Sequence, residues 1–309
     1  FLEVGQGARP GRGTHPGNQA KTPRWFPEKF YEISESFSEP NVGWLFPKQK
    51  KSKRTRFESI ADKFLKQIKK LMKELKDSLE GENIDEIYGA AISLRNKSKK
   101  IHSSDNTIDT AGTGGDKLGT LNISTAAALV SASAGVKIAK HGNRSVSSKS
   151  GSADVLEKMG IKIDFEIDKI EKILKEKNFC FMFAPLFHTA MKHVGPVRKE
   201  LGTRTIFNLL GPLLNPANTK KQLLGVYDKE LVSIHAQILK KLESEHILVV
   251  HGFDGLDEIS LSTNSYVAEL KDKKIKEYIF NPEEIGYSYI NLDKIKGGDA
   301  TFNAKEIMK

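Results

Sequence analysis

Short apolar runs alternate with helical patterns from about residue 107 to the end of the chain. The apolar runs have the length and flanks of buried strands and fall at 136–139, 179–184, 223–227 and 247–250. Apolar residues at helical spacing fill the other segments, at 124–134, 153–159, 168–177, 189–201 and 229–242. This alternation favours an α/β fold in which helices flank a mostly parallel sheet. A lysine-rich stretch at 271–276 is predicted to be a solvated turn.

Two helices are predicted ahead of this region. Between residues 58 and 80, lysines fill one face, and the other face carries the apolar residues Ile60, Phe64, Ile68, Leu71 and Leu75. Asn83, with Glu86 three residues later, has the form of a capping box and predicts a second helix through Leu94. Residues 1–57 contain Gly and Pro clusters without a sustained period. We therefore expect three parts: a disordered or non-homologous segment over 1–57, a partial helical domain over 58–104 and an α/β catalytic domain over 105–309.

The composition narrows the class of protein. The 309 residues are enough for one large or two medium domains with a sizeable core. No apolar run approaches the ~18 residues that span a bilayer, and residues 1–20 lack the pattern of a signal peptide. The single cysteine, Cys180, excludes an internal disulfide and fits a reducing cytosol. Because Cys180 lies within an apolar run, we interpret it as a small core residue.

The net charge of +10 is unevenly distributed along the chain, because most of the excess lies in the first 100 residues. Six cations gather in one short run there, Lys48, Lys50, Lys51, Lys53, Arg54 and Arg56. Such a run is typical of a nucleic-acid tail or of a solvated, disordered segment. Since the excess is local, we interpret the run as solvated and expect neither a nucleic-acid nor a membrane partner.

A glycine-rich loop is expected over 109–116, after a strand and shortly before a helix that begins near Ser124. Gly112, Gly114 and Gly115 let the backbone bend sharply and bring N–H groups close to a ligand. With a helix N-terminus behind them, such groups favour phosphate. The pattern is not a P-loop, because no Gly-Lys-Ser/Thr ends it. From the glycines alone, a structural turn is the alternative.

Asn122, Ser124 and Thr125 place three hydrogen-bonding side chains at the start of an apolar helix. Asn122 or Ser124 alone could supply an N-cap. The surplus of polar groups beside the glycine-rich loop equally suits a phosphate or a metal. From these residues alone both interpretations stay open.

A flexible cationic loop is expected over 140–154, after the strand at 136–139. It carries Lys140, Arg144 and Lys149 together with hydroxyl groups and glycines. That set suits an anion with several oxygens. His141, in the same loop, is interpreted as structural rather than catalytic on its own evidence.

Two adjacent carboxylates, Asp257 and Glu258, follow the strand expected at 247–250. At the carboxyl end of a strand they suit a hard cation such as Mg²⁺. Asp-Glu pairs are also common on surfaces, so this assignment depends on a phosphate ligand nearby.

In this order, the motifs resemble the anthranilate phosphoribosyltransferase family. The most specific match is the long block from Val197 to Ala217, and the resemblance extends from about Asn83 to Lys309. It implies transfer of phosphoribose from phosphoribosyl pyrophosphate to the amino group of anthranilate. The products would be N-(5-phosphoribosyl)anthranilate and pyrophosphate, in tryptophan synthesis. The alternatives are a related phosphoribosyltransferase or nucleoside phosphorylase with another acceptor, and an inactive truncated homologue.

The resemblance implies a set of site residues, Mg²⁺ as cofactor and a homodimer as a possible assembly. Matches to the family's contacts with phosphoribosyl pyrophosphate are Gly112, Gly115, Asp116, Thr120, Asn122, Ser124, Thr125, Lys140, His141, Gly142, Asn143, Arg144, Ser145, Val146, Ser147, Ser148 and Ser152. Matches to its anthranilate contacts are Gly112, Asn143 and Arg198, with Arg198 the expected partner of the carboxylate. Matches to its Mg²⁺ ligands are Ser124, Asp257 and Glu258.

The chemistry implied by the resemblance requires no dedicated acid or base. The amine of anthranilate is neutral at pH 7 and can attack the sugar carbon directly. We therefore assign no catalytic acid or base and expect positioning and electrostatics to dominate.

The resemblance is incomplete at both ends of the chain. The family begins with a compact helical domain, of which only the part from about Asn83 matches clearly. Residues 302–309 resemble the opening of a late helix, and we expect the family's last helices to be missing. Their loss would expose apolar surface, and we expect a truncated or misassembled reading frame.

Overall fold

The computed structural model describes Lys66, Lys70 and residues 83–145, 149–195, 197, 200 and 204–309. Contacts divide the chain into the units Phe1–Arg54 and Thr55–Lys309, and all described residues belong to the second. Lys66 and Lys70 are helical, as expected for the helix over 58–80. Residues 1–57, including the basic run at 48–56, lie outside the described residues, so the expectations for them stay untested.

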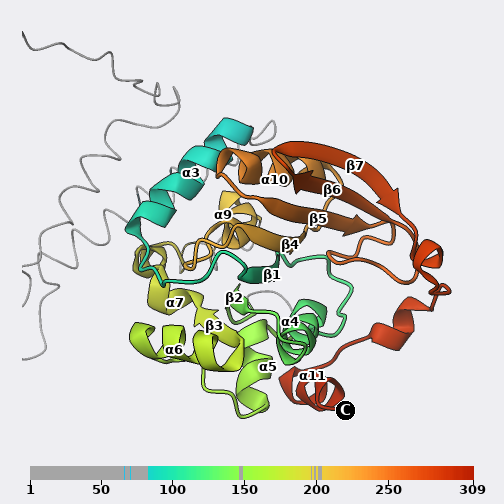
Figure 1. Cartoon of the computed structure of the whole chain (residues 1–309), viewed down its shortest axis with the longest axis horizontal. Helices are drawn as coiled ribbons and strands as arrows, with labels where there is room; N and C mark the ends of the chain where they lie inside the picture. The colour runs from blue at the N-terminus through green and yellow to red at the C-terminus, as the bar shows by residue number, and fades with distance from the viewer. Residues whose placement is uncertain are drawn as a thin grey trace, which may run out of the picture. The chain divides into compact units, whose positions relative to one another are not determined.

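In the part of the chain that the structure describes, seven strands form one sheet in the order β3-β2-β1-β4-β5-β6-β7 (Figure 1). The strands are β1 Ile108–Gly112, β2 Ile138–Gly142, β3 Phe179–Phe183, β4 Lys221–Gly225, β5 His246–Gly252, β6 Ser265–Lys271 and β7 Lys274–Phe280. Strands β1 to β5 are parallel to one another. Strand β6 pairs antiparallel with β5, and β7 pairs antiparallel with β6. The expected α/β fold with a mostly parallel sheet is therefore confirmed.

Helices connect and cover these strands. The α-helices are α3 Ile84–Lys97, α4 Ile123–Ser133, α5 Ser152–Lys158, α6 Ile167–Lys177, α7 Ala184–Phe187, α9 Ile206–Leu210, α10 Glu230–Lys241 and α11 Ala300–Ile307. Short 3₁₀ helices are η1 Thr189–His193, η2 Gly211–Leu213, η3 Pro282–Ile285 and η4 Leu292–Ile295. The predicted capping box of α3 is present, because Asn83 Oδ1 accepts from the Glu86 N–H at 3.0 Å and the Glu86 carboxylate accepts from the Asn83 N–H at 3.2 Å.

The core is divided between the two ends of the sheet (Figure 1). At one end α3, α9 and α10 bury apolar side chains against β4, β5 and β6. At the other end, α4, α5 and α6 pack near β1, β2 and β3. Cys180 lies in this second part, 2% exposed, and burial raises the pKa of its thiol to about 12. The interpretation of Cys180 as a core residue is confirmed.

Two of the differences from the expected strand boundaries affect the predicted site. The strand expected at 136–139 begins at Ile138, because the N–H of Val136 bonds to Ser131 at the end of α4. Lys140 and His141 therefore belong to β2 and not to a flexible loop. Asp109 was expected in the glycine-rich loop, but it lies within β1. In both places the strand runs into the polar motif, because polar side chains at these positions are buried inside the sheet.

The single helix expected over 189–201 is wrong. Residues Thr189–His193 form the 3₁₀ helix η1, Val194 is a turn, and helical conformation returns at Gly195. The neighbouring sequence supplies a physical reason, because Pro196 has no N–H to donate and is tolerated only in the first turn of a helix.

The lysine-rich stretch at 271–276 is only partly a turn. Asp272 and Lys273 form the turn, both with positive φ, as in a two-residue hairpin connection. The lysines on either side pair with each other as the ends of β6 and β7. The hairpin escaped prediction because β7 is an edge strand of exposed and half-buried residues, without the continuous apolar run by which the buried strands were predicted.

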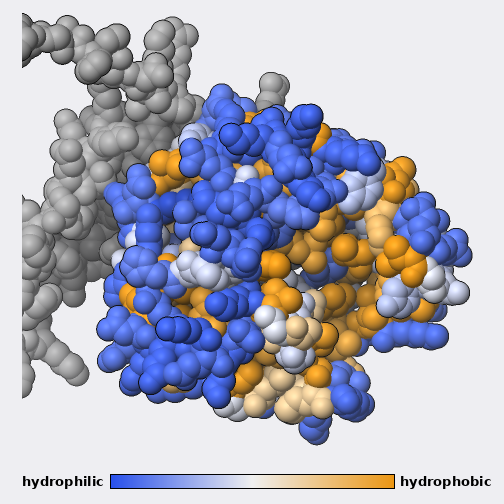
Figure 2. Space-filling view, viewed as in Figure 1, coloured by the Kyte–Doolittle hydropathy of each residue, from blue (hydrophilic) through white to orange (hydrophobic). Residues whose placement is uncertain are grey.

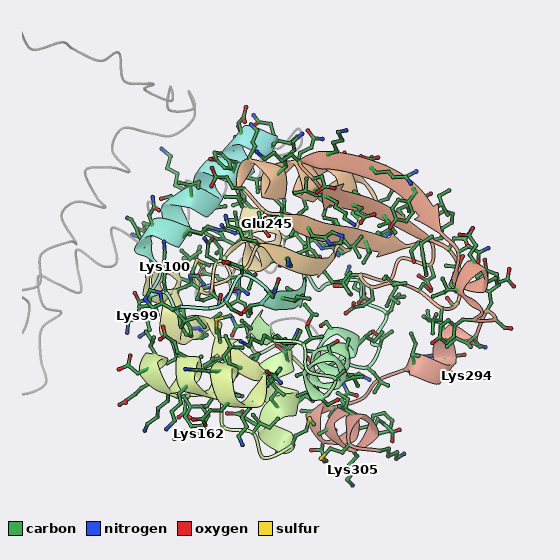
Figure 3. The ribbon with its side chains drawn as sticks, in the orientation of Figure 1. Lys99, Lys100, Lys162, Glu245, Lys294 and Lys305 are labelled. Carbon is green, nitrogen blue, oxygen red and sulfur yellow. The ribbon has the colours of Figure 1, made fainter. Side chains whose placement is uncertain are left out.

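The surface is mostly polar, with apolar residues gathered in one region. Figure 2 shows hydrophobic residues between the β5–β7 strands and α4 and α11. Exposed apolar side chains include Val130, Phe253, Ile279, Ile285, Tyr287, Tyr289, Phe302 and Met308. The exposed lysines labelled in Figure 3 lie at separate places on the described unit, on the segment after α3, near α6 and near the C-terminus. Among the described residues, no helix is long and apolar enough to span a membrane.

Candidate active site

The carboxyl ends of β1, β2, β4 and β5 bring the predicted motifs to one edge of the sheet. The chain places β2 and β3 on one side of β1 and then returns to place β4 on the other side. Gly112 at the end of β1 pairs with Gly225 at the end of β4. In open α/β sheets, ligands bind outside the carboxyl ends at such a switch point. The topology therefore favours a site beside Gly112 and Gly225.

The glycine-rich loop leaves β1 in a conformation that only glycine adopts readily. Gly114 and Gly115 have φ of 65° and 85°. Thr113 fixes the loop to β4, because its N–H donates to the Gly225 carbonyl at 2.9 Å. Its hydroxyl accepts from the N–H of Tyr227 at 3.1 Å. These two hydrogen bonds hold the loop against the carboxyl end of β4.

The polar residues at the start of α4 do not cap the helix. Asn122 makes no side-chain cap; its amide donates to the Ser150 carbonyl at 3.2 Å and its oxygen accepts from Asn303 at 2.8 Å. The N–H of Ser124 donates instead to the carboxylate of Glu258 at 3.1 Å. Thr125 Oγ1 is buried without a hydrogen-bond partner among the described residues. The N-cap interpretation of Asn122 is wrong, and the helix terminus already faces an anionic group.

Thr120 lies between the glycine-rich loop and α4. It forms an isolated antiparallel bridge with Lys296. Its carbonyl also packs so closely on Gly297 that a Cβ there would collide with it. The segment ahead of α11 therefore fixes the end of the loop.

Lys140 is a buried cation, 2% exposed, inside β2. Its ammonium group donates to the Thr110 carbonyl at 2.5 Å and lies 3.3 Å from Ser124 Oγ. Burial lowers the pKa of Lys140, and the charges of Asp109 and Glu258 oppose that change. The first cation of the flexible loop expected from the sequence therefore lies in β2, next to the start of α4.

Asp109 supports this cation from β1. It is completely buried, and burial raises the pKa of its carboxyl group to about 6, opposed chiefly by the charge of Lys140. Its oxygens accept from the His141 N–H at 3.2 Å and from the Gln222 side chain at 3.4 Å. Asp109 therefore ties together the neighbouring strands β1, β2 and β4 beneath the site.

Three carboxylates meet above the sheet edge: Asp116, Asp257 and Glu258. Burial, and then the charge of Asp116, raises the pKa of Asp257 to about 7. Burial, and then the charge of Asp257, raises the pKa of Glu258 to about 8. Asp116 Oδ2 is buried without a hydrogen-bond partner among the described residues. The cluster therefore brings together three carboxyl groups beside one cation, Lys140.

This donor set fits a hard divalent cation. Oxygen ligands of high charge and an unpartnered carboxylate oxygen are what Mg²⁺ binds. Among the described residues, no three His, Cys, Asp or Glu side chains could hold a metal by themselves. Mg²⁺ is commonly held by one or two carboxylates together with phosphate oxygens of a substrate. The cluster therefore fits a cation that arrives with a diphosphate.

Arg144 follows β2 and is held by α5. Its guanidinium donates to the Glu157 carboxylate at 2.5 and 2.7 Å and to Asp154 at 2.9 Å. It also lies 5.5 Å from the ring centroid of Phe183. Glu157 first, and then Asp154, raises the pKa of Arg144. Contact of Arg144 with an anionic ligand would require this arginine to leave the two carboxylates.

The backbone around Asn143 is tightly packed. The Asn143 carbonyl accepts from the Ala153 N–H at 3.3 Å and from Ser152 Oγ at 3.4 Å. A Cβ at Gly142 would collide with Ser152 and with the ring of Phe181, and one at Gly151 would collide with Ser145. These contacts hold residues 142–145 against residues 151–153 beside the end of β2.

His141 and His188 form a buried pair. Their Nε2 atoms lie 3.1 Å apart, and His188 is 5% exposed. Burial, and then the charge of His188, lowers the pKa of His141 to about 3, and burial lowers the pKa of His188 to about 4. Both rings are therefore neutral at pH 7. The contact supports a structural role for His141, although it does not test a contact with substrate.

Comparisons with known proteins agree with this geometry. The family model described as "Glycosyl transferase family, a/b domain" matches residues 104–309. An anthranilate phosphoribosyltransferase of Thermoanaerobacter sp. (strain X514) is 52% identical over 231 residues, which cover 74% of this chain and 68% of that protein. One from Chloroherpeton thalassium is 50% identical over 231 residues, covering 74% and 67%. The chain belongs to the anthranilate phosphoribosyltransferase family.

Solved structures of the family share this fold. The anthranilate phosphoribosyltransferase of Thermus thermophilus has a TM-score of 0.72 at 41% identity, covering 79% of this chain and 72% of that one. The Saccharomyces cerevisiae anthranilate phosphoribosyltransferase in complex with phosphoribosyl pyrophosphate and Mg has a TM-score of 0.74 at 30% identity, covering 84% and 71%. The same yeast enzyme has been solved in complex with 4-fluoroanthranilate.

The structure brings most of the predicted site residues of this anthranilate phosphoribosyltransferase family member to one edge. Four of them, Val146, Ser147, Ser148 and Arg198, lie outside the described residues, so their placement stays a prediction. Gly112 lies beside the cluster, because a Cβ on it would lie 3.2 Å from Asp257 Oδ2. Lys149 is exposed, whereas Lys140 is buried.

Three further residues of the site escaped assignment from the sequence. Asp109 belongs to the stretch expected as the glycine-rich loop, but its burial is not evident from the sequence. Gly225 had only the weak signal of a glycine after an apolar run. Arg204 lies in the long block that resembles the family, where only Arg198 was assigned a role. The guanidinium of Arg204 donates to the Gly115 carbonyl at 2.5 Å.

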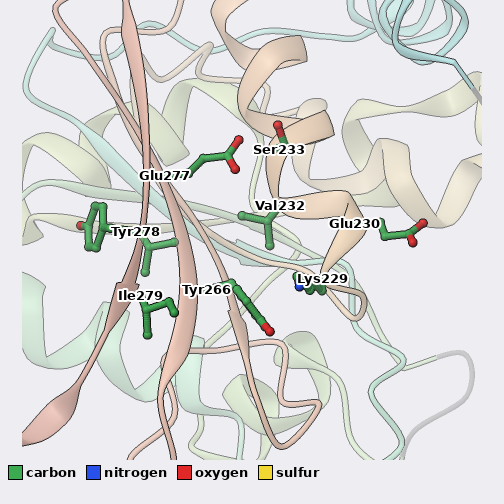
Figure 4. A pocket seen from close by; sticks show the side chains of 9 residues that line it. Lys229, Glu230, Val232, Ser233, Tyr266, Glu277, Tyr278 and Ile279 are labelled. Carbon is green, nitrogen blue, oxygen red and sulfur yellow. The ribbon is translucent and has the colours of Figure 1, made fainter.

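A separate hollow of about 460 Å³ lies between α10 and the β6–β7 hairpin (Figure 4). None of the predicted site residues lines it. Its features are the ring of Tyr266, with Lys229 4.3 Å from the ring centroid, and the exposed Ile279. We assign no part of the active site to this hollow.

Proposed function

We propose that the chain transfers phosphoribose from phosphoribosyl pyrophosphate to the amino group of anthranilate, with pyrophosphate as the second product. One observation carries the proposal: a glycine-rich loop, a helix N-terminus, a buried lysine and three carboxylates meet at the switch point of the sheet. This set suits a ligand that combines a diphosphate with a divalent cation. Membership of the family supports the choice of substrates.

The donor sugar would lie over the glycine-rich loop and the start of α4. Backbone N–H groups of a glycine-rich turn and of a helix N-terminus stabilise phosphate oxygens. Lys140 lies 3.3 Å from Ser124 Oγ and would supply positive charge where negative charge grows on the leaving diphosphate. The residues proposed to line this part are Gly112, Gly115, Asp116, Thr120, Asn122, Ser124, Thr125 and Lys140, followed by His141 to Ser148 and Ser152.

Ser124, Asp257 and Glu258 would hold Mg²⁺. The cation would supply positive charge to the diphosphate oxygens and so stabilise their departure. Two hydrogen bonds within the protein hold these carboxylates in place: Glu258 accepts from the Ser124 N–H, and Asp257 accepts from the backbone of Gly114. Their raised pKa values mean that cation binding and proton release are coupled.

Anthranilate would bind beside Gly112 and Asn143, with Arg198 pairing with its carboxylate. An arginine matches a planar carboxylate with two parallel hydrogen bonds. The amine is neutral at pH 7 and needs no general base, so positioning against the sugar carbon dominates. We further propose a cytosolic location, which the single buried cysteine supports, and a homodimer, as the family resemblance implies.

The test is direct. The full chain is incubated with phosphoribosyl pyrophosphate, Mg²⁺ and anthranilate, and the loss of anthranilate fluorescence is followed over time. We expect turnover that requires all three additions. Arg198→Ala should reduce turnover by raising the KM for anthranilate far more than the KM for the sugar. Circular dichroism confirms folding. A folded chain without turnover would overturn the proposal, and turnover only with another aromatic or base acceptor would replace anthranilate as the substrate.

A further inference from the structure

Arg204 joins the glycine-rich loop to the segment that follows β4. Its Nη2 donates to the Gly115 carbonyl at 2.5 Å, and its guanidinium carbon lies 3.7 Å from the ring centroid of Tyr227. The N–H of Tyr227 in turn donates to Thr113 Oγ1 at 3.1 Å. The loop is therefore tied at two points, two residues apart, to one short segment.

The contact at Gly115 controls the direction of a peptide group. Gly114 and Gly115 both have positive φ and no Cβ, so local sterics hold their peptide planes only weakly. The carbonyl of Gly115 and the N–H of Asp116 belong to one planar trans peptide and point in opposite directions. A donor that fixes the Gly115 carbonyl therefore fixes the direction of the Asp116 N–H as well. Asp116 is also the residue whose carboxylate oxygen lacks a partner among the described residues.

We propose that Arg204 is a positioning residue that holds the Gly115–Asp116 peptide in the orientation that binds the diphosphate of the sugar donor. The inference rests on the proposed function, which supplies the diphosphate. Arg204 acts through Gly115, and Tyr227 holds the guanidinium by stacking. Arginine suits this role because its planar group can stack on a ring and donate in its own plane, which an ammonium group cannot do.

Binding of phosphoribosyl pyrophosphate with Mg²⁺ to the full chain, measured by calorimetry, tests the role. We expect Arg204→Gln to weaken binding about ten- to thirtyfold, the cost of ordering one free peptide of the loop. The KM for the sugar should rise by a similar factor, while the KM for anthranilate changes less than about threefold. Arg204→Lys should recover little. Lys229→Gln removes a comparable cation over the ring of Tyr266 and should leave both constants unchanged.

A double-mutant cycle separates positioning from direct contact with the substrate. If Arg204 acts through its stack on Tyr227, Tyr227→Leu should weaken sugar binding as Arg204→Gln does, and the double variant should be no weaker than either. Additive losses would overturn the positioning role, because Arg204 would then contact the ligand independently of Tyr227.

Hydrogen exchange without ligand tests the inference apart from the proposed function. Amides of 112–118 should exchange faster in Arg204→Gln and Tyr227→Leu than in the wild type, while those of β5 stay unchanged. Unchanged exchange at 112–118 would overturn the inference even if the enzyme is active. If exchange is faster in the two variants but the wild type binds no sugar, the loop contact is supported and the proposed function is overturned instead.

Discussion

Gly225 lies between the glycine-rich loop and the segment that carries Asp257 and Glu258. It ends β4, pairs with Gly112 of β1 and accepts a hydrogen bond from Thr113. The backbone of Asp257 passes so close to it that a Cβ would overlap the Asp257 carbonyl oxygen. Because the obstacle is backbone, no rotamer change can relieve the overlap.

We predict that Gly225→Ala lowers the free energy of unfolding by about 1–3 kcal/mol and reduces turnover more than its stability loss explains. The reason is that the Asp257–Glu258 segment must move away from the glycine-rich loop. Denaturant unfolding and steady-state kinetics measure the two effects. Gly89→Ala is the matched control, since nothing lies within 4 Å of its added Cβ in α3. That variant should gain about 0.5–1 kcal/mol in stability. Wild-type kinetics in Gly225→Ala would contradict the close approach.

At the scale of elements, the connection between β5 and β6 holds the two acidic residues in place. Asp254 is its centre: its carboxylate accepts from Ser260 Oγ at 2.6 Å, from Ser262 Oγ, and from the Leu256 N–H at 3.1 Å. Ser260 is completely buried and its N–H donates to Ser265 at the start of β6. Asp254 therefore fixes a loop whose next turn presents Asp257 and Glu258.

We predict that Asp254→Ala raises the Mg²⁺ concentration needed for half-maximal turnover by about tenfold or more. Hydrogen bonds to a charged group are worth about 1.5–3 kcal/mol each, so their loss frees the loop as well as destabilising it. Initial rates over a magnesium titration provide the measurement. Ser133→Ala, which removes a local bond to Val130 at the exposed end of α4, is the control and should keep the wild-type titration. An unchanged magnesium requirement in Asp254→Ala would show that the loop holds its shape without this residue.

The sequence was informative wherever a signal is local. The capping box at Asn83, the strand before Asp257 and the start of α4 follow from spacing within one element. The role of Asn122 did not follow, because its partners Ser150 and Asn303 come from distant parts of the chain. The burial of Lys140 was missed for a similar reason. The end of β2 was expected at Ala139 and lies at Gly142, which moved that lysine from the strand into a loop.

At the scale of the whole molecule, the site is a product of strand order. β1 and β2 supply the glycine-rich loop and Lys140, while β4 and β5 supply Gly225 and the acidic pair. Gly112 and Gly225 are separated along the chain by more than a hundred residues, yet they are direct neighbours in the sheet. A ligand bound there contacts both sides of the switch point and should stabilise the described unit as a whole.

We therefore predict that Mg²⁺ and phosphoribosyl pyrophosphate raise the thermal midpoint cooperatively. At a hundredfold excess over Kd, binding contributes about 2.7 kcal/mol, or roughly 5–10 °C for a unit of this size. Each addition alone should give much less, because the buried carboxylates need a cation and the cation needs phosphate oxygens. Differential scanning calorimetry with each component, with both, and after chelation gives the comparison. Asp257→Asn with Glu258→Gln should remove the cooperativity but leave any small effect of the sugar alone. Strictly additive shifts in the wild type would contradict a shared site at the ends of these four strands.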